Sequence, residues 1–150
     1  MKIDELRERT EPALKVSGPS DLMPVLARYA SKRQEHFVAV LLDGAQQVIR
    51  IKVVTIGLLN RTLAHSREVF RPALLESAAS LILVHNHPSG LMEPSREDRE
   101  MTSRMAQAGK LLGIEVLDHL IISTKGYYSF KESGDMPLGF GGKQEGAVHE

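Results

Sequence analysis

Two histidines separated by one residue stand directly behind an apolar run in the middle of the chain. Residues 81–84 form the short apolar run that is typical of a buried strand, and His85-Asn86-His87 follows at once. On extended backbone, side chains two residues apart point to the same side with their Cα atoms roughly 6.5–7 Å apart, so both imidazoles can reach one metal ion at about 2.0–2.1 Å. Asn86 must then face the opposite side. The pattern predicts a strand that ends in a pair of metal-binding imidazoles.

An acidic side chain follows the histidine pair after one short loop. Pro88 and Gly90 are residues that end a strand and form a turn. Ser95 is a typical N-cap residue, and it predicts a helix that continues to Leu112 and carries Asp98 in its first turn, facing the histidines. Ser95 and Asp98 also fit a capping box, which stabilises a helix start whether or not a metal is near. Two imidazoles and one carboxylate are nevertheless ligands that zinc accepts in open catalytic sites, where the fourth position is left for water.

The spacing of these residues resembles the signature of the JAMM (JAB1/MPN-type) metalloproteases. His85-x-His87, seven further residues and Ser95-x-x-Asp98 match that signature, and residues 85–90 resemble more closely the RadC branch of the bacterial JAB-domain proteins. The resemblance extends from about residue 35 to residue 130. It implies an α+β (α/β/α) fold of the JAB1/MPN type, cytidine-deaminase-like, in which helices flank a mixed central sheet.

The same resemblance implies a role for each residue of the signature. It implies one zinc ion per chain, held by His85, His87 and Asp98, with Ser95 near the bound water. Two neutral imidazoles and one carboxylate leave a zinc site with a net charge near +1, which lowers the pKa of a bound water toward about 7. We therefore expect a zinc-dependent metallohydrolase that cleaves peptide or isopeptide bonds, with the zinc and the Ser95 hydroxyl stabilising the oxyanion.

The family also uses an upstream glutamate as general acid and base. Glu35 stands before residues 37–42, which are apolar on both faces and therefore predict a central strand. We assign the catalytic carboxylate to Glu35, because the JAMM glutamate also lies near the beginning of an early strand. Glu35 would take a proton from the water and return it to the leaving amine. Glu68 is the alternative base, and an isolated glutamate before a strand would ordinarily be a surface acid.

Four further polar residues are candidates for the surroundings of the site or its cleft. His65 follows a segment that we expect to cross the mouth of the site, although a solvent-facing loop histidine is the more ordinary interpretation. Asp118 and His119 interrupt an apolar run that predicts another strand. They could orient a metal-binding histidine or position substrate, or they could form a satisfied polar pair within the sheet. Asn86 is the fourth candidate.

The elements that position these residues fit one domain of 150 residues. We expect a mobile N-terminal arm over residues 1–18, a RadC-like JAB/MPN domain over 19–133 and a flexible C-terminal tail over 134–150. Within the domain, the pattern predicts a helix capped near Ser20, a hairpin of two strands, a helix starting at Ser66 that leads to the histidine strand, and further strands after the Asp98 helix.

Composition narrows the class of protein. The 19 basic and 19 acidic side chains cancel, so no overall charge attracts nucleic acid or an anionic membrane. The absence of cysteine excludes disulfides, thiolate zinc ligands and cysteine nucleophiles, and is compatible with a reducing cytosol. No apolar run is long enough to span a bilayer. We expect a cytoplasmic protein without a membrane partner, and the sequence predicts neither its oligomeric state nor its substrate.

Three other functions share part of this pattern. Two-metal nucleases and phosphohydrolases usually need more carboxylates, and zinc nucleoside deaminases need cysteine ligands that this chain lacks. RadC-like proteins also carry a DNA-repair label, so a DNA-associated or scaffold module with a structural metal is the main alternative. The zero net charge disfavours it, and we expect no counterpart of the helix-hairpin-helix region of longer family members before Glu35. Salt-dependent binding to DNA would favour it.

Overall fold

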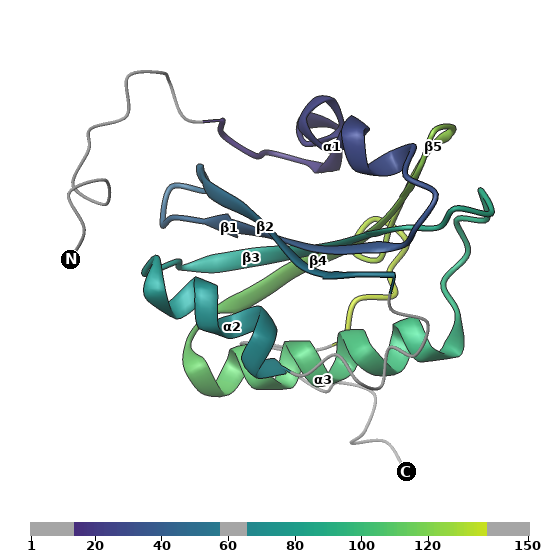
Figure 1. Cartoon of the computed structure of the whole chain (residues 1–150). Helices are drawn as coiled ribbons and strands as arrows, with labels where there is room; N and C mark the ends of the chain where they lie inside the picture. The colour runs from purple at the N-terminus through teal and green to yellow at the C-terminus, as the bar shows by residue number, and fades with distance from the viewer. Residues whose placement is uncertain (1–13, 58–65, 138–150) are drawn as a thin grey trace, which may run out of the picture.

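A five-stranded mixed sheet forms the centre of the fold (Figure 1). This computed structural model describes residues 14–57 and 66–137. Across the sheet the strands lie in the order β2 (Val48–Ile56), β1 (His36–Leu42), β3 (Ser80–Asn86), β4 (Glu115–Ser123) and β5 (Gly126–Ser129). Neighbouring strands are antiparallel except β3 and β4, which run parallel. The predicted mixed sheet is confirmed.

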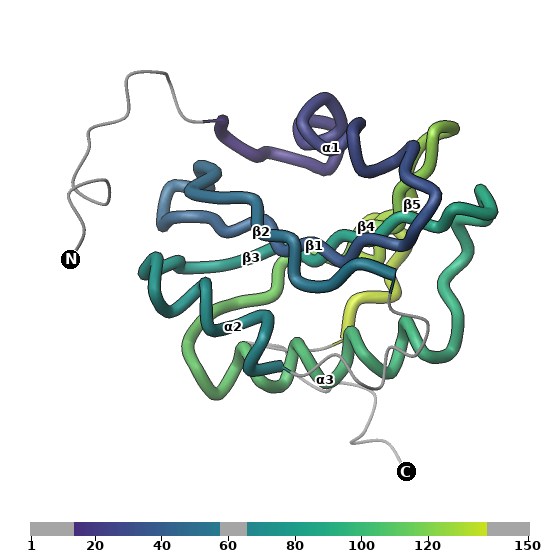
Figure 2. Tube along the Cα trace, viewed as in Figure 1, coloured from purple at the N-terminus to yellow at the C-terminus, as the bar shows by residue number. Residues whose placement is uncertain are grey.

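Helices cover both faces of this sheet, as Figures 1 and 2 show. One face carries the short 3-10 helix η2 (Pro19–Asp21) and α1 (Met23–Ala30), and the other carries α2 (Ser66–Leu75) and α3 (Arg96–Leu112). α3 connects β3 to β4, because parallel neighbours require a crossover. The three layers confirm the predicted α+β fold. Within residues 14–57 and 66–137, no helix is both long enough and apolar enough to span a membrane.

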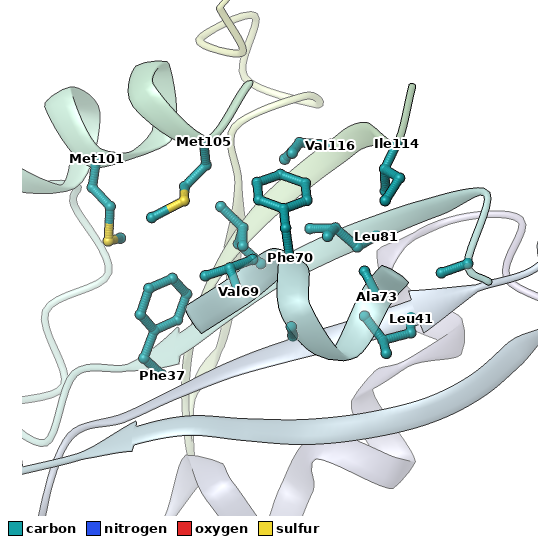
Figure 3. Packing of buried hydrophobic residues seen from close by; sticks show 13 residues of the cluster. Phe37, Leu41, Val69, Phe70, Ala73, Leu81, Met101, Met105, Ile114 and Val116 are labelled. Carbon is teal, nitrogen blue, oxygen red and sulfur yellow. The ribbon is translucent and has the colours of Figure 1, made fainter. Parts of the chain in front are cut away.

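Strands β1 and β3 are buried along their whole length. Their odd-numbered residues, such as Phe37 and Leu81, belong to the core cluster beneath α2 and α3 (Figure 3), whereas even-numbered residues, such as Val38 and Val84, belong to the cluster beneath α1. Burying one large apolar side chain contributes about 1.5–3 kcal/mol. A slip of β3 by one residue would exchange its two faces, so both core clusters fix its register.

Helix α3 begins with the predicted capping box. The Asp98 N–H donates to Ser95 Oγ at 3.1 Å, and the Ser95 N–H donates to Asp98 Oδ2 at 2.9 Å. The helix ends at Gly113, whose backbone is left-handed with a φ of 73°. Because the N-cap follows shortly after β3, the capping box places the first turn of α3 close to the end of that strand.

The described ends of the chain pack on the domain. Lys15 forms an antiparallel bridge with Gln47, and Val16 is buried in the cluster beneath α1. Met136 packs against the cluster beneath α2 and α3. The inner ends of the predicted arm and tail therefore contact the domain. Their other residues, 1–13 and 138–150, lie outside the described part of the chain, so the predicted domain boundaries stay a prediction.

Gly109 allows α3 to approach the beginning of β4 closely. A Cβ atom at this position would lie 2.3 Å from the carbonyl oxygen of Ile114 and 3.3 Å from both Phe70 and Val116. The same turn is closed by the Ile114 N–H, which donates to the Gly109 carbonyl at 2.9 Å. The backbone of Ile114 therefore leaves no space for a side chain at residue 109.

Gly109→Ala should lower the free energy of unfolding by about 1–2 kcal/mol. Alanine favours a helix over glycine by about 0.8–1.0 kcal/mol. Overpacking typically costs about 1–3 kcal/mol, and the 2.3 Å approach to a backbone oxygen puts this site in the upper half of that range, about 2–3 kcal/mol. Urea unfolding followed by circular dichroism measures the difference. Gln107→Ala, at an exposed position of α3, is the control and should change stability by less than about 0.5 kcal/mol. A more stable Gly109→Ala variant would contradict the close approach.

Candidate metal centre

The predicted metal ligands meet at the edge of the sheet where β3 ends. His85 is the second-last residue of β3, and His87 directly follows that strand. Asp98 lies in the first turn of α3, and Glu35 directly precedes β1. We call these four residues the candidate metal centre. The side chains of His85 and Asp98 are 1% and 0% exposed, whereas those of His87 and Glu35 are 13% and 15% exposed. The centre therefore has a buried floor and a rim that reaches solvent.

The donor atoms of this centre lie within a few ångströms of one another. Asp98 Oδ1 is 3.3 Å from His85 Nε2, and Asp98 Oδ2 is 3.4 Å from His87 Nε2. The two Nε2 atoms are 2.8 Å apart. Glu35 Oε1 is 4.0 Å from His85 Nε2 and 3.9 Å from His87 Nε2. Glu35, His85 and His87 together form a group that could hold a metal ion, and Asp98 lies closer still to both imidazoles.

The loop after β3 fixes the orientation of the His87 ring. His87 Nδ1 is 2.6 Å from the carbonyl oxygen of Leu91. A carbonyl can only accept, so Nδ1 must carry the hydrogen and donate it. In the neutral ring, Nε2 then holds the lone pair, and this atom faces His85 and Asp98. The loop therefore presents the nitrogen that a metal would need.

Electrostatics in the centre favour an ionised Asp98. Burial by itself raises the pKa of Asp98, but the imidazoles of His85 and His87, which lie against its two oxygens, outweigh burial and hold this pKa well below its usual range. The hydrogen bond to Asp98 raises the pKa of His87, against the lowering effect of burial. The carboxylate is thus available as a ligand at any ordinary pH. At a given pH a larger fraction of His87 is protonated than of an ordinary histidine, and a metal must displace that proton.

Asn86 faces away from the two histidines, as predicted, and holds the segment that carries Glu35. Its Oδ1 accepts from the His36 N–H at 2.6 Å, and its Nδ2 donates to the carbonyls of Lys32 and Gln34, each at 3.1 Å. The carbonyl of Glu35 itself accepts from the Gly57 N–H at 2.7 Å. Asn86 is 0% exposed. The residue between the two imidazoles therefore fixes the backbone on both sides of Glu35.

A groove of about 690 Å³ opens above the centre. Glu35, Gly57 and Gln34 line one part of it, and residues 88–95 supply most of the remainder. Ser95 lines the groove although its Oγ also caps α3. The predicted position of Ser95 beside the site is thus compatible with its capping role. The groove gives solvent and ligands access to His87 and Glu35.

The remaining predicted residues lie at different places. His65 is outside the described residues. Glu68 is on α2 and lines grooves beside that helix, but it does not line the groove above the centre. Asp118 accepts from the Ser129 hydroxyl at 2.6 Å and from the Lys131 N–H at 3.0 Å, so its carboxylate ties β4 to the chain after β5. Burial raises the pKa of Asp118. The structure therefore places Glu68 and Asp118 away from the imidazole pair.

His119, by contrast, contacts the ring of His85 and does not line the groove. Its Nε2 is 2.7 Å from His85 Nδ1, and its Nδ1 is 2.5 Å from the hydroxyl oxygen of Thr102. Sequence analysis missed Thr102. Its spacing was a usable signal, because a residue four positions after Asp98 lies one helical turn along the same face of α3.

Comparison with known proteins places the chain in a family. The RadC-like JAB domain matches residues 16–135. The chain belongs to the RadC-like JAB domain family. A UPF0758 protein of Rubrobacter xylanophilus is 52% identical over 120 residues, which cover 79% of this chain and 52% of the relative. A UPF0758 protein of Methanosarcina mazei is 46% identical over 125 residues, covering 83% and 55%. This RadC-like JAB domain spans about half the length of the curated relatives it matches.

Metal binding by this RadC-like JAB domain should weaken as the pH falls. A metal needs the neutral form of His87, whose pKa is raised, so protons compete with it at and below the folded-state pKa. With Zn²⁺ as the probe, the dissociation constant should rise about tenfold for each pH unit below that pKa, since one proton is displaced. Competition with a chromophoric chelator between pH 5.5 and pH 8 measures it, after correction for protonation of the chelator. A constant affinity over this range would contradict the assigned competition.

Proposed function

We propose that this domain is a zinc-dependent hydrolase of the JAMM type that cleaves a peptide or isopeptide bond. One observation carries the proposal. Two imidazole nitrogens and a buried carboxylate converge on one point, and a second carboxylate, that of Glu35, approaches the same point from the solvent-facing groove. This combination supplies both a ligand set for a metal and a base beside it.

The distances favour His85, His87 and Asp98 as the ligands. Ligands at about 2.0–2.1 Å from a tetrahedral zinc ion lie about 3.3 Å from one another. The distances of 3.3 and 3.4 Å from Asp98 to the two imidazole nitrogens match this spacing, whereas Glu35 is 3.9–4.0 Å from the same atoms. The two nitrogens, 2.8 Å apart, would need to separate by about half an ångström. Two imidazoles and one carboxylate are the donor set of several catalytic zinc sites.

In this assignment Glu35 is the general base and acid. A bound zinc ion supplies Lewis acidity, which makes water available as a nucleophile near neutral pH. Glu35 is partly exposed in the groove and lies at nearly equal distances from His85 and His87, so its carboxylate can take a proton from the attacking water. It can then return the proton to the leaving amine. Ser95 Oγ accepts from the Asp98 N–H and keeps its own hydrogen for donation to the oxygen on which negative charge develops.

The groove fits a polypeptide better than a nucleic acid. Among the described residues, the charged side chains that line the groove are Glu35, Glu93 and Arg33, so carboxylates outnumber the basic side chain. Together with the proposed zinc ion and Asp98, these groups leave a net charge near zero, so no excess of positive charge is present to hold a polyphosphate backbone. Leu91, which is 70% exposed, and Pro88 add apolar surface at the mouth. An extended peptide with apolar side chains satisfies both properties.

Glu35→Gln should keep the metal and lose turnover. Glutamine preserves the shape of the side chain but removes its basicity, and loss of a general base lowers rates by about 100-fold to 10,000-fold. Cleavage of a peptide library, followed by mass spectrometry, together with zinc content per chain, measures both effects. Glu97→Gln, which alters an exposed carboxylate on the first turn of α3, is the matched control and should retain wild-type cleavage.

Three other outcomes would contradict the assigned role of Glu35 or the proposed activity. A Glu35→Gln variant that cleaves at the wild-type rate would remove Glu35 from the chemistry. A Glu35→Gln variant that loses zinc would instead assign Glu35 to the ligand set. Zinc-loaded wild-type protein that cleaves no peptide or isopeptide substrate would contradict the proposed activity.

A further inference from the structure

A chain of buried hydrogen-bonding groups runs behind His85, on the side away from the groove. The Thr102 hydroxyl donates to the carbonyl of Asp98 at 2.6 Å, and its oxygen lies 2.5 Å from His119 Nδ1. His119 Nε2 lies 2.7 Å from His85 Nδ1. Thr102 and His119 are 0% exposed, and His85 is 1% exposed. The chain thus links the backbone of Asp98 to the ring of His85 without access to solvent.

The proton positions along this chain follow from the number of donors. A hydroxyl has one hydrogen, and Thr102 gives it to the Asp98 carbonyl, so its oxygen can only accept from His119 Nδ1. A neutral imidazole carries one N–H, which leaves His119 Nε2 as an acceptor for His85 Nδ1–H. His85 Nε2 therefore holds the lone pair. This atom faces His87 and Asp98.

The His119 ring is also held in place by its neighbours. It stacks on Phe130 with ring centres 4.8 Å apart and planes at 12°, and on Phe37 at 6.4 Å and 19°. Stacking on these two rings restrains the tilt of the imidazole plane. Its two nitrogens thus stay directed at Thr102 and His85, and the remaining freedom of the chain is the position of its protons.

We propose that Thr102, acting through His119, is a positioning residue that fixes the tautomer of His85 and so presents Nε2 as a metal ligand. The inference rests on the proposed role of His85 as a ligand. Without the hydroxyl, His119 Nδ1–H would face no acceptor at Thr102. His119 would then carry its proton on Nε2 and donate to His85 Nδ1, and His85 would move its own proton to Nε2. Each ring stays neutral, but Nε2 of His85 becomes a donor.

Thr102→Val and Thr102→Ser form a matched pair that tests this assignment. Valine keeps the branched shape and removes the hydroxyl, whereas serine keeps the hydroxyl. In the metal-free 150-residue chain at neutral pH, ¹⁵N NMR of labelled histidines should show the Nδ1–H tautomer of His85 in the wild type and in Thr102→Ser, and the Nε2–H tautomer in Thr102→Val. The affinity for Zn²⁺ should fall about 10-fold to 100-fold in Thr102→Val, while Thr102→Ser should stay near the wild-type value.

Two results would overturn the inference. One is a folded Thr102→Val variant in which His85 keeps the Nδ1–H tautomer, and the other is a changed tautomer with wild-type Zn²⁺ affinity. Backbone amide spectra establish that the variants are folded, and Thr102→Ala gives the same test if valine is not accommodated. The tautomer is measured without metal and without substrate, so its outcome is distinguishable from a failure of the proposed hydrolase activity.

Discussion

The burial of the Asp98 carboxylate is the constraint on which the rest of the structure depends. An ionised carboxylate removed from water is costly unless hydrogen bonds and opposite charge offset the loss of hydration. Asp98 is 0% exposed, and its oxygens receive the Ser95 N–H and lie against the imidazoles of His85 and His87. The amino-terminal end of α3 also favours negative charge there. Because these partners come from β3, its following loop and α3, the carboxylate ties the helix to the strand.

At this end of the sheet, the two faces of β3 carry different parts of the site. The alternation that directs Leu81 and Leu83 toward α3 also directs His85 there, whereas Asn86 continues the row that faces α1. The imidazoles therefore form the centre, and the amide between them fixes the backbone around Glu35 from behind. A tripeptide at the end of a strand buried on both faces thus positions two of the proposed ligands and the proposed base. This arrangement explains how Glu35, fifty residues before His85 in the chain, comes to lie beside both imidazoles.

Local patterns predicted the helices and strands around the site, whereas the fold class and the ligand role of Asp98 were predicted from the resemblance to the JAB-domain family. The two-residue period of β3 and the N-cap at Ser95 predicted how His85, His87 and Asp98 would be placed, because strand and capping geometry depend on near neighbours. Contacts between distant segments were beyond such patterns. The choice between Glu35 and Glu68 depends on the pairing of β1 with β3, and the contact of Thr102 with His119 depends on how α3 packs on β4. Asp118 and His119 looked alike in sequence, but adjacent strand residues face opposite sides.

The most direct test of this account is the metal content of the wild-type protein and of the double variant His85→Ala/His87→Ala. Both should be purified without chelator and without a histidine tag, and analysed for all first-row transition metals before and after dialysis against dilute zinc. The account predicts about one zinc per chain in the wild type and none retained in the double variant. A wild-type protein that retains no metal, even after zinc is added, would contradict the claim that these side chains form a metal centre.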